Sequence, residues 1–256
     1  MPEPITVTDE SAIQLGEEVQ GTFSAPELSI VMPVYNEERA LPGVLDEAIA
    51  SLATVPYRLE ILLVDDASTD RSLEILQDYE RRHPGVVRII RHEMNRGIMG
   101  AFETLYNSAR GRYVFMNASD GQWKTAECLR FLDLRDRYDI IVGRRRAKNY
   151  TLWRKVVSGS FNLLPRVLFG VRTHDAGSIK LFRQDVLRIP LISRSPFREA
   201  ERIIRANRRG YRIGAIEVEH HDRHGGRATG ARWPLVVMSI SDLVRCWWQI
   251  VILRRP

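Results

Sequence analysis

Residues 59–70 read LEILLVDDASTD, and this stretch decides the fold class. Five of its first six residues are apolar, a pattern typical of a strand buried on both faces of a parallel sheet. The predicted strand covers residues 59–66 and ends in two carboxylates, Asp65 and Asp66. Residues 68–70 then supply the short polar side chains that cap the start of a helix. The stretch therefore predicts a buried strand followed directly by a helix.

The same alternation of apolar strands and amphipathic helices extends in both directions along the chain. Further strands are predicted over residues 28–35, 86–92, 112–118 and 138–143, and further helices over residues 37–52, 97–109 and 125–135. Short strands separated by helices indicate a mostly parallel sheet with helices on both faces. We therefore expect an α/β protein with a Rossmann-like sheet.

Polar side chains follow three of the predicted strands at the point where each ends. These are Asn36 with Glu37, Asp65 with Asp66, and Ser119 with Asp120. In open parallel sheets, ligands bind at the carboxyl ends of the strands. The sequence therefore predicts a ligand site at this edge. A dinucleotide cofactor is excluded, because residues 33–38 read PVYNEE and lack the glycines of that fingerprint.

The alternation weakens beyond residue 145. Here the pattern predicts helices over 152–169 and 195–209, a strand over 211–220 and a tryptophan-rich segment over 233–255. We interpret the chain as a loosely ordered leader (1–27), one α/β domain (28–232) and an amphipathic, basic C-terminal helix (233–256).

Composition narrows the class of protein. The 256 residues are 44% hydrophobic, which is enough for a sizeable core. Cys128 and Cys246 form no spaced cluster, which argues against a disulfide scaffold or thiolate zinc site and fits a reducing compartment. The acidic start lacks the apolar core of a secretory signal. No uninterrupted run of 18 apolar residues occurs, and the nearest candidate, 233–253, contains Asp242 and Arg245.

Charge is segregated along the chain. Residues 1–80 carry 3 basic and 17 acidic side chains, whereas residues 81–256 carry 35 basic and 15 acidic ones. Nearly all the basic residues are arginines, whose planar fork binds phosphate. An anionic partner for the second half is therefore expected. Nucleic acid is not expected, because no recognition motif accompanies the charge.

Four motifs in order at strand ends resemble family 2 glycosyltransferases, which have the GT-A fold. The motifs are PVYNE at 33–37, VDDASTD at 64–70, NRG at 95–97 and DGQ at 120–122. The resemblance continues through residues 142–144, 154–158, 175, 180–182, 201 and 220–226, as in the polyprenyl-phosphate, dolichol-phosphate mannose synthase-like branch. It implies an inverting transferase that uses a nucleotide diphosphate sugar, with a GDP- or UDP-sugar as donor.

The resemblance implies roles for residues at the donor side. Residues expected to line the nucleoside pocket or contact the donor are Pro33, Tyr35, Glu37, Asp65, Asp66, Gly97 and His220. Asp66 would bind the base or ribose through its carboxylate. Capping of the next helix is the alternative for the aspartates, but residues 68–70 already serve that purpose.

The metal motif of the family is incomplete in this chain. The family has Asp-x-Asp after the fourth strand, where this chain has Ala118-Ser119-Asp120. A Mg²⁺ or Mn²⁺ site built from Asp120, Gln122 and the donor pyrophosphate is expected, because these cations accept few protein ligands when phosphates and waters complete the shell. Asn117 lies one position too early to replace the missing carboxylate.

Residues of the basic half are implied at the acceptor side. Arg144, Arg154 and Ser158 match positions that hold the acceptor phosphate, and the last two lie one helical turn apart. Arg223 lies in a basic loop expected to close over the donor diphosphate. Glu201 is the candidate general base, although a phosphate acceptor is already an anion and needs none.

The sequence allows more than one acceptor and more than one role for the C-terminal segment. Trp233, Trp247 and Trp248, with nearby arginines, suggest that the tail contacts a membrane surface from the cytoplasmic side; a packed helix or a homo-oligomer contact is the alternative. The acceptor is expected to be polyprenyl phosphate. A soluble small-molecule acceptor and a non-catalytic nucleotide-sugar-binding homologue are the rival functions.

Overall fold

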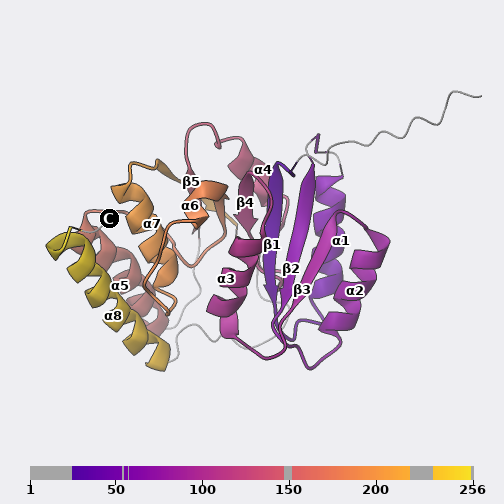
Figure 1. Ribbon diagram of the computed structural model, residues 1–256, viewed down its shortest axis with the longest axis horizontal. Helices are drawn as coiled ribbons and strands as arrows, with labels where there is room; N and C mark the ends of the chain where they lie inside the picture. Colours follow the sequence, from indigo (N-terminus) through magenta and orange to yellow (C-terminus); the bar gives the residue numbers. More distant parts are fainter. Residues whose placement is uncertain (1–24, 54, 57, 147–151, 220–232, 255–256) are drawn as a thin grey trace, which may run out of the picture.

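The protein is described by a computed structural model that covers residues 25–53, 55–56, 58–146, 152–219 and 233–254, with the side chains of 152–158 excepted. A sheet of seven strands divides the molecule (Figure 1). The strands are β1 (Leu28–Val34), β2 (Leu59–Asp65), β3 (Val87–Arg91), β4 (Tyr113–Met116), β5 (Ile140–Arg145), β6 (Lys180–Arg183) and β7 (Ile213–Val218).

The strand order is β3-β2-β1-β4-β6-β5-β7, and only β6 runs antiparallel to its neighbours in this sheet. Met116 of β4 and Val142 of β5 both pair with Lys180 at the start of β6. Because β6 is reversed, its first residues lie at the same edge as the carboxyl ends of the other strands. The predicted GT-A-type, mostly parallel sheet is confirmed.

Helices cover both faces of the sheet. They are α1 (Leu41–Leu52), α2 (Ser72–Arg82), α3 (Gly97–Ser108), α4 (Glu127–Leu132), α5 (Leu152–Phe169), α6 (Gln184–Leu187), α7 (Arg198–Arg208) and α8 (Trp233–Trp247), which runs into the π-helical turn η1 (Trp248–Ile252). Figure 1 shows α5 and α8 side by side at the end of the molecule farthest from α2.

Two apolar clusters form because side chains alternate along each strand. In β1, Ile30 and Met32 pack toward α1, α2 and α4, whereas Val31 points to the other face. That second face is covered by α3, α6, α7 and α8, whose buried side chains include Leu105 and Ile203. The result is a layer of strands between two layers of helices.

Two of the differences between the structure and the predicted elements concern the sheet region beyond β4. The helix expected over 125–135 is only six residues long, and β6 was not predicted as a strand. β6 has four residues, and its Lys180 is fully buried, where it donates to the carbonyls of Ala176 and Ser178 at 2.8 Å and lies 3.3 Å from Glu199. A short strand containing a lysine lacks the apolar signal by which buried strands are recognised.

Candidate active site

The loops after β1 and β2 are joined by side chains that bond to the other loop's backbone. Ser72 Oγ accepts a hydrogen bond from the amide of Glu37 at 2.9 Å, and Asn36 Oδ1 accepts one from the amide of Thr69 at 2.8 Å. Asn36 has a φ of 54°, a left-handed conformation that asparagine tolerates. Pro33 lies within β1, and these bonds fix Glu37 just after the strand and leave Tyr35 exposed between them.

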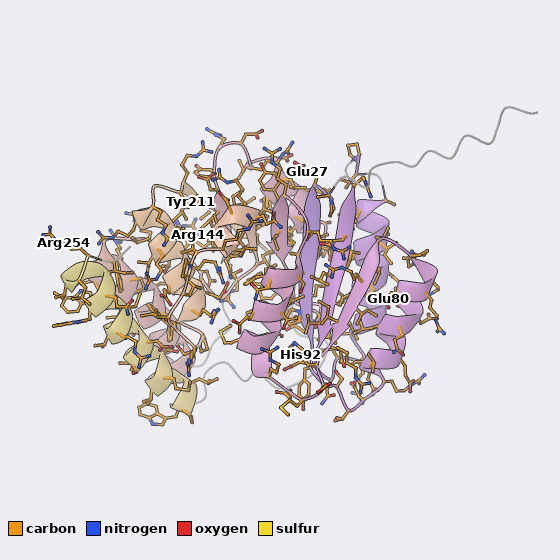
Figure 2. All side chains as sticks on the ribbon, viewed as in Figure 1. Glu27, Glu80, His92, Arg144, Tyr211 and Arg254 are labelled. Atoms are coloured by element: carbon orange, nitrogen blue, oxygen red, sulfur yellow. The ribbon has the colours of Figure 1, made fainter. Side chains whose placement is uncertain are left out.

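Asp66 is buried at this edge, directly after β2, at 3% exposure. Its Oδ1 lies 2.6 Å from Nδ1 of His92 and accepts the amide hydrogen of Arg96 at 2.8 Å. Nε2 of His92 lies 2.8 Å from Oγ1 of Thr104 on α3. Figure 2 shows His92 at the edge where β3 ends, opposite Glu27, which leads into β1. Asp66 thus ties the end of β2 to the start of α3.

His92 was not identified from the sequence as part of the site. It is 6% exposed and follows β3 directly. The available signal was a polar residue at the carboxyl end of a third parallel strand, which is the position that marked Asp66 after β2.

Asp65 differs from Asp66 in its hydrogen bonding. Its Oδ1 accepts the amide hydrogen of Ser68 at 3.3 Å, whereas its buried Oδ2 has no partner within the described part of the chain. Buried carboxylate oxygens without partners are uncommon and call for an explanation. The pair therefore contains one oxygen that can still accept a hydrogen bond.

Gly97 opens α3 beside this pair. Its φ of 71° favours glycine, and its amide donates to Asn95 Oδ1 at 3.1 Å. Asn95 in turn donates to the backbone carbonyl of Asp66 at 3.3 Å. The expected donor residues from β2 and α3 are thus brought together by direct contacts.

Asp120 lies in the loop after β4, the central strand of the sheet. Its Oδ1 accepts the amide hydrogen of Gln122 at 3.1 Å across Gly121, and the side chain is almost fully buried. The neighbouring Ser119 Oγ donates to the carbonyl of Pro33 at 2.7 Å, which connects this loop to β1. The predicted convergence of the three polar clusters at one edge is therefore seen in the structure.

Asn117 points away from the site. It is fully buried, and its Nδ2 donates to Thr125 Oγ1 at 3.1 Å. It therefore supplies no substitute for the missing first carboxylate. In the part of the chain that the structure describes, no group of three or more His, Cys, Asp or Glu side chains could hold a metal ion alone.

The family description "Glycosyl transferase family 2" matches residues 29–189, which include all three strand-end clusters. The chain belongs to glycosyltransferase family 2. The dodecaprenyl-phosphate galacturonate synthase of Rhizobium johnstonii is 31% identical over 222 residues, which cover 82% of this chain and 64% of that protein.

Two further proteins place this family 2 chain among its relatives. The undecaprenyl-phosphate 4-deoxy-4-formamido-L-arabinose transferase of Pseudomonas aeruginosa is 30% identical over 86% of this chain and 64% of its own length. The chain thus spans just under two thirds of the curated relatives that it matches. Glucosyl-3-phosphoglycerate synthase from Mycobacterium tuberculosis, solved with Mn²⁺ and UDP, shares the fold with a TM-score of 0.67 and 16% identity, over 86% of this chain and 80% of that one.

The family's acceptor positions are less completely described. Arg144 is the second-last residue of β5, and its side chain is more than half exposed, with Nη2 2.6 Å from Glu217 Oε1. Arg154 and Ser158 lie in the first half of α5, but their side chains fall outside the described set. His220 and Arg223 also lie outside the described residues. Their roles stay predictions.

Glu201, the candidate base of this family 2 chain, is fully buried in α7. Its two oxygens accept the amide hydrogens of Ile192 and Ser193 at 2.8–3.2 Å, and Oε1 also accepts Nε–H of Arg205 at 2.6 Å. A carboxylate occupied in this way holds a loop in place. The geometry therefore favours a structural role for Glu201 over proton abstraction from a substrate.

Proposed function

We propose that this chain is an inverting glycosyltransferase that moves a sugar from a nucleotide diphosphate sugar to polyprenyl phosphate. The observation that carries the proposal is the convergence of Asp65, Asp66 and Asp120 at one edge of a family 2 sheet. Two relatives at 30–31% identity are polyprenyl-phosphate sugar transferases by name, which supports the acceptor class.

The donor nucleoside is assigned to the pocket beside β1 and β2. Asp65 Oδ2 is the buried acceptor that lacks a partner within the described residues, and a base or ribose hydrogen-bond donor would satisfy it. Asp66 is already engaged by His92 and Arg96, so its role is to shape the pocket as well as to contact ligand. Tyr35, at 47% exposure, is available to cover the nucleoside.

Asp120 and Gln122 fit a divalent cation only together with the donor. One carboxylate and one amide are too few for a site made of protein alone, but Mg²⁺ is commonly bound by one or two carboxylates plus substrate phosphates. Such a cation would neutralise charge on the departing diphosphate. Glucosyl-3-phosphoglycerate synthase, which shares this fold, was solved with Mn²⁺ and UDP, which supports the assignment.

The acceptor chemistry agrees with the absence of a free base at Glu201. A phosphate monoester has its second pKa near ~6 and is an anion at neutral pH. One of its oxygens forms the new bond to the anomeric carbon as the bond to the nucleoside diphosphate breaks, and the diphosphate leaves with the electron pair. The configuration at that carbon inverts, and the protein needs only to position the two anions.

Helix α8 supports an acceptor embedded in a membrane. Within the described residues, the segment Trp233–Ile252 is long and apolar enough to cross a membrane, and 28% of it is buried against the protein. Asp242, one of the polar interruptions, points inward, where its Oδ2 accepts the amide hydrogens of Arg194 and Ser195 at 2.9 Å. The outward stripe includes Val237, Ile240 and Val244. We assign this stripe, which we call the α8 apolar stripe, to the cytoplasmic membrane surface.

The test is a transfer assay with the purified chain. We expect sugar from a UDP- or GDP-sugar panel to appear on undecaprenyl phosphate in vesicles, and we expect Asp120→Ala to abolish transfer. Mass spectrometry of the extracted lipid provides the measurement. Transfer to a soluble phosphate ester but never to the lipid would replace the acceptor assignment, and nucleotide binding without any transfer would favour a non-catalytic homologue.

A further inference from the structure

A cavity of about 280 Å³ lies between α5, the loop that follows it and the end of β5. We call it the α5 pocket. It is lined by Arg144, Asn162, Arg166, Arg172, Thr173 and His174. No carboxylate is among these lining residues, so the set is suited to an anion rather than a cation.

The positive charge of the α5 pocket is poorly neutralised. Arg166 and Arg172 form no ion pair with any residue that the structure describes. Arg144 is paired with Glu217, but both side chains are more than half exposed, so water screens that pair. Asp175, next to His174, is bound by Arg145 through two hydrogen bonds of 2.7 Å and has little charge to offer.

Two features of the loop after α5 lower the stability of the free protein unless a ligand compensates for them. Thr173 is fully buried, and its Oγ1 has no hydrogen-bond partner within the described chain. His174 has a φ of 55°, a left-handed conformation that is unfavourable for a residue with a side chain. Strained backbone and unsatisfied polar atoms of this kind gather at functional sites.

Side chains that do not line the α5 pocket hold its lining loop in place. Arg145 holds Asp175, and the buried Lys180 donates to the carbonyls of Ala176 and Ser178. The loop that carries Thr173 and His174 is therefore fixed between β5 and β6. A pocket built in advance loses little entropy when it binds its ligand.

The position of the pocket links the membrane to the donor. Arg144 is the second-last residue of β5, and the loop carrying His174 runs into β6 at the edge where Asp120 follows β4. On α5 itself, Leu163 and Val167 are exposed one residue beyond Asn162 and Arg166. Adjacent faces of one helix thus present an apolar surface and a basic pocket.

We propose that the α5 pocket binds the phosphate monoester of the acceptor, with Arg166 and Arg172 as its principal ligands and Thr173 as a hydroxyl donor. The proposal rests on the proposed function and assigns its acceptor subsite to residues that the sequence motifs did not single out. The guanidinium fork matches two phosphate oxygens at once. The polyprenyl chain then lies along Leu163 and Val167.

The first experiment measures acceptor kinetics in two arginine variants and a control. Arg166→Ala and Arg172→Ala should each raise the KM for polyprenyl phosphate about tenfold or more, since each removes a charge-assisted contact. Their donor KM should stay within about twofold of wild type, because the donor is assigned to the ends of β1 and β2 and not to this pocket. Arg137→Ala removes an exposed arginine at the opposite edge of the sheet and should change neither constant. Unchanged acceptor KM in both pocket variants overturns the proposal even if wild type transfers sugar normally.

The second experiment tests the pocket without turnover, so that it does not depend on activity. Farnesyl phosphate should raise the Tm of wild type but not of Arg172→Ala, and farnesol, which lacks the phosphate, should raise neither. Phenyl phosphate separates the sources of the anion: a shift equal to that of farnesyl phosphate indicates a free phosphate ester, and a smaller one a lipid phosphate. Stabilisation by galacturonate but by no phosphate ester would overturn the proposal in favour of a sugar carboxylate.

Thr173→Val separates a ligand contact from a structural defect. Valine has nearly the same shape but no hydroxyl, so the unsatisfied oxygen disappears and the free protein should gain stability. If the hydroxyl bonds the phosphate, the farnesyl phosphate shift should fall at the same time. Higher stability with an undiminished phosphate shift would remove Thr173 from the site.

Discussion

The Asp66 carboxylate joins a predicted ligand contact to a structural contact made through His92 and the amide of Arg96. Asp66→Ala should therefore weaken nucleotide binding and also destabilise the fold by about 1–3 kcal/mol, since buried donors lose their acceptor. Asp65→Asn removes the negative charge of the carboxylate that contains the unsatisfied Oδ2. It should weaken nucleotide binding with a smaller loss of stability than Asp66→Ala. Urea unfolding and nucleotide titration of the two variants measure the two effects. Unchanged nucleotide affinity in both would refute the pocket assignment.

His174 predicts a pH dependence at the residue scale. Burial lowers its pKa below the usual 6.5, and the charges of Arg144 and Arg172 lower it further, with Arg166 lining the same pocket. The unfolded chain then binds more protons than the folded one as pH falls below about 6.5, so stability present above that pH is lost. His174→Asn, which tolerates a positive φ, should lose less stability than wild type between pH 7.5 and 5.5 in urea unfolding. Equal losses in the two proteins would contradict this.

At the scale of elements, β4 begins where the backbone leaves no room for a side chain. A Cβ on Gly111 would lie 2.4 Å from the amide nitrogen of Ser29 in β1. The Gly111 amide also donates to Ser29 Oγ at 2.7 Å, so the two strands cannot separate without breaking this bond.

Two glycine-to-alanine variants should therefore have opposite effects. Gly111→Ala should destabilise the protein by about 1–3 kcal/mol through overpacking. Gly159→Ala, in α5 with nothing near its Cβ position, should stabilise it by up to about 1 kcal/mol through helix propensity. Denaturant midpoints of the pair provide the measurement, and similar midpoints would show that the strand contact is not tight.

Helix α8 has two faces that can be tested separately. The inward Asp242 bonds two amides of the loop before α7, so Asp242→Ala should lower stability and leave vesicle binding intact. The double change Ile240→Asp and Val244→Asp alters the α8 apolar stripe and should abolish sedimentation with anionic vesicles at unchanged stability. If both variants sediment like wild type, the stripe does not contact the membrane.

At the scale of the whole molecule, the acidic and basic parts of the sequence lie mostly on different sides of the fold. The described residues of the acidic part form β1, α1, β2 and most of α2, whereas the basic part forms the rest of the sheet, including β3, and the α5–α8 side with the α5 pocket. Asp120 follows β4, the middle strand of the seven, so it lies where the two sides meet. A cation there would lie between the donor diphosphate and the acceptor.

Metal dependence tests this arrangement. Transfer should require Mn²⁺ or Mg²⁺ and stop in excess chelator. Ala118→Asp restores a second carboxylate and should lower the metal concentration that gives half-maximal activity, because the added ligand carries charge. Activity that survives chelation, with a weaker donor affinity in Ala118→Asp, would show instead that basic side chains neutralise the diphosphate.

The sequence by itself determined most of the elements of the sheet and the edge at which the strand-end polar residues gather. The run LEILLVDD is typical of a buried strand in a parallel sheet, and the carboxyl ends of parallel strands meet at one edge. Asp66 and Asp120 were found this way because their chemistry is local: a charged residue directly after an apolar run. The same strand-end motifs gave the resemblance to family 2, which the family match over residues 29–189 confirmed.

Tertiary structure alone decided which polar side chains are free to act. Glu201 is occupied by neighbouring amides, and His92 supports Asp66, yet nothing in their local sequence distinguishes these roles. The α5 pocket combines Arg144 with Arg166 and Arg172 from separate segments. Spacing along the chain does not reveal such a group, because antiparallel β6, a strand without a clear apolar signal, folds these segments together. The burial of a side chain and its hydrogen-bond partners depend on packing between distant segments of the chain, and a local sequence pattern does not contain this information.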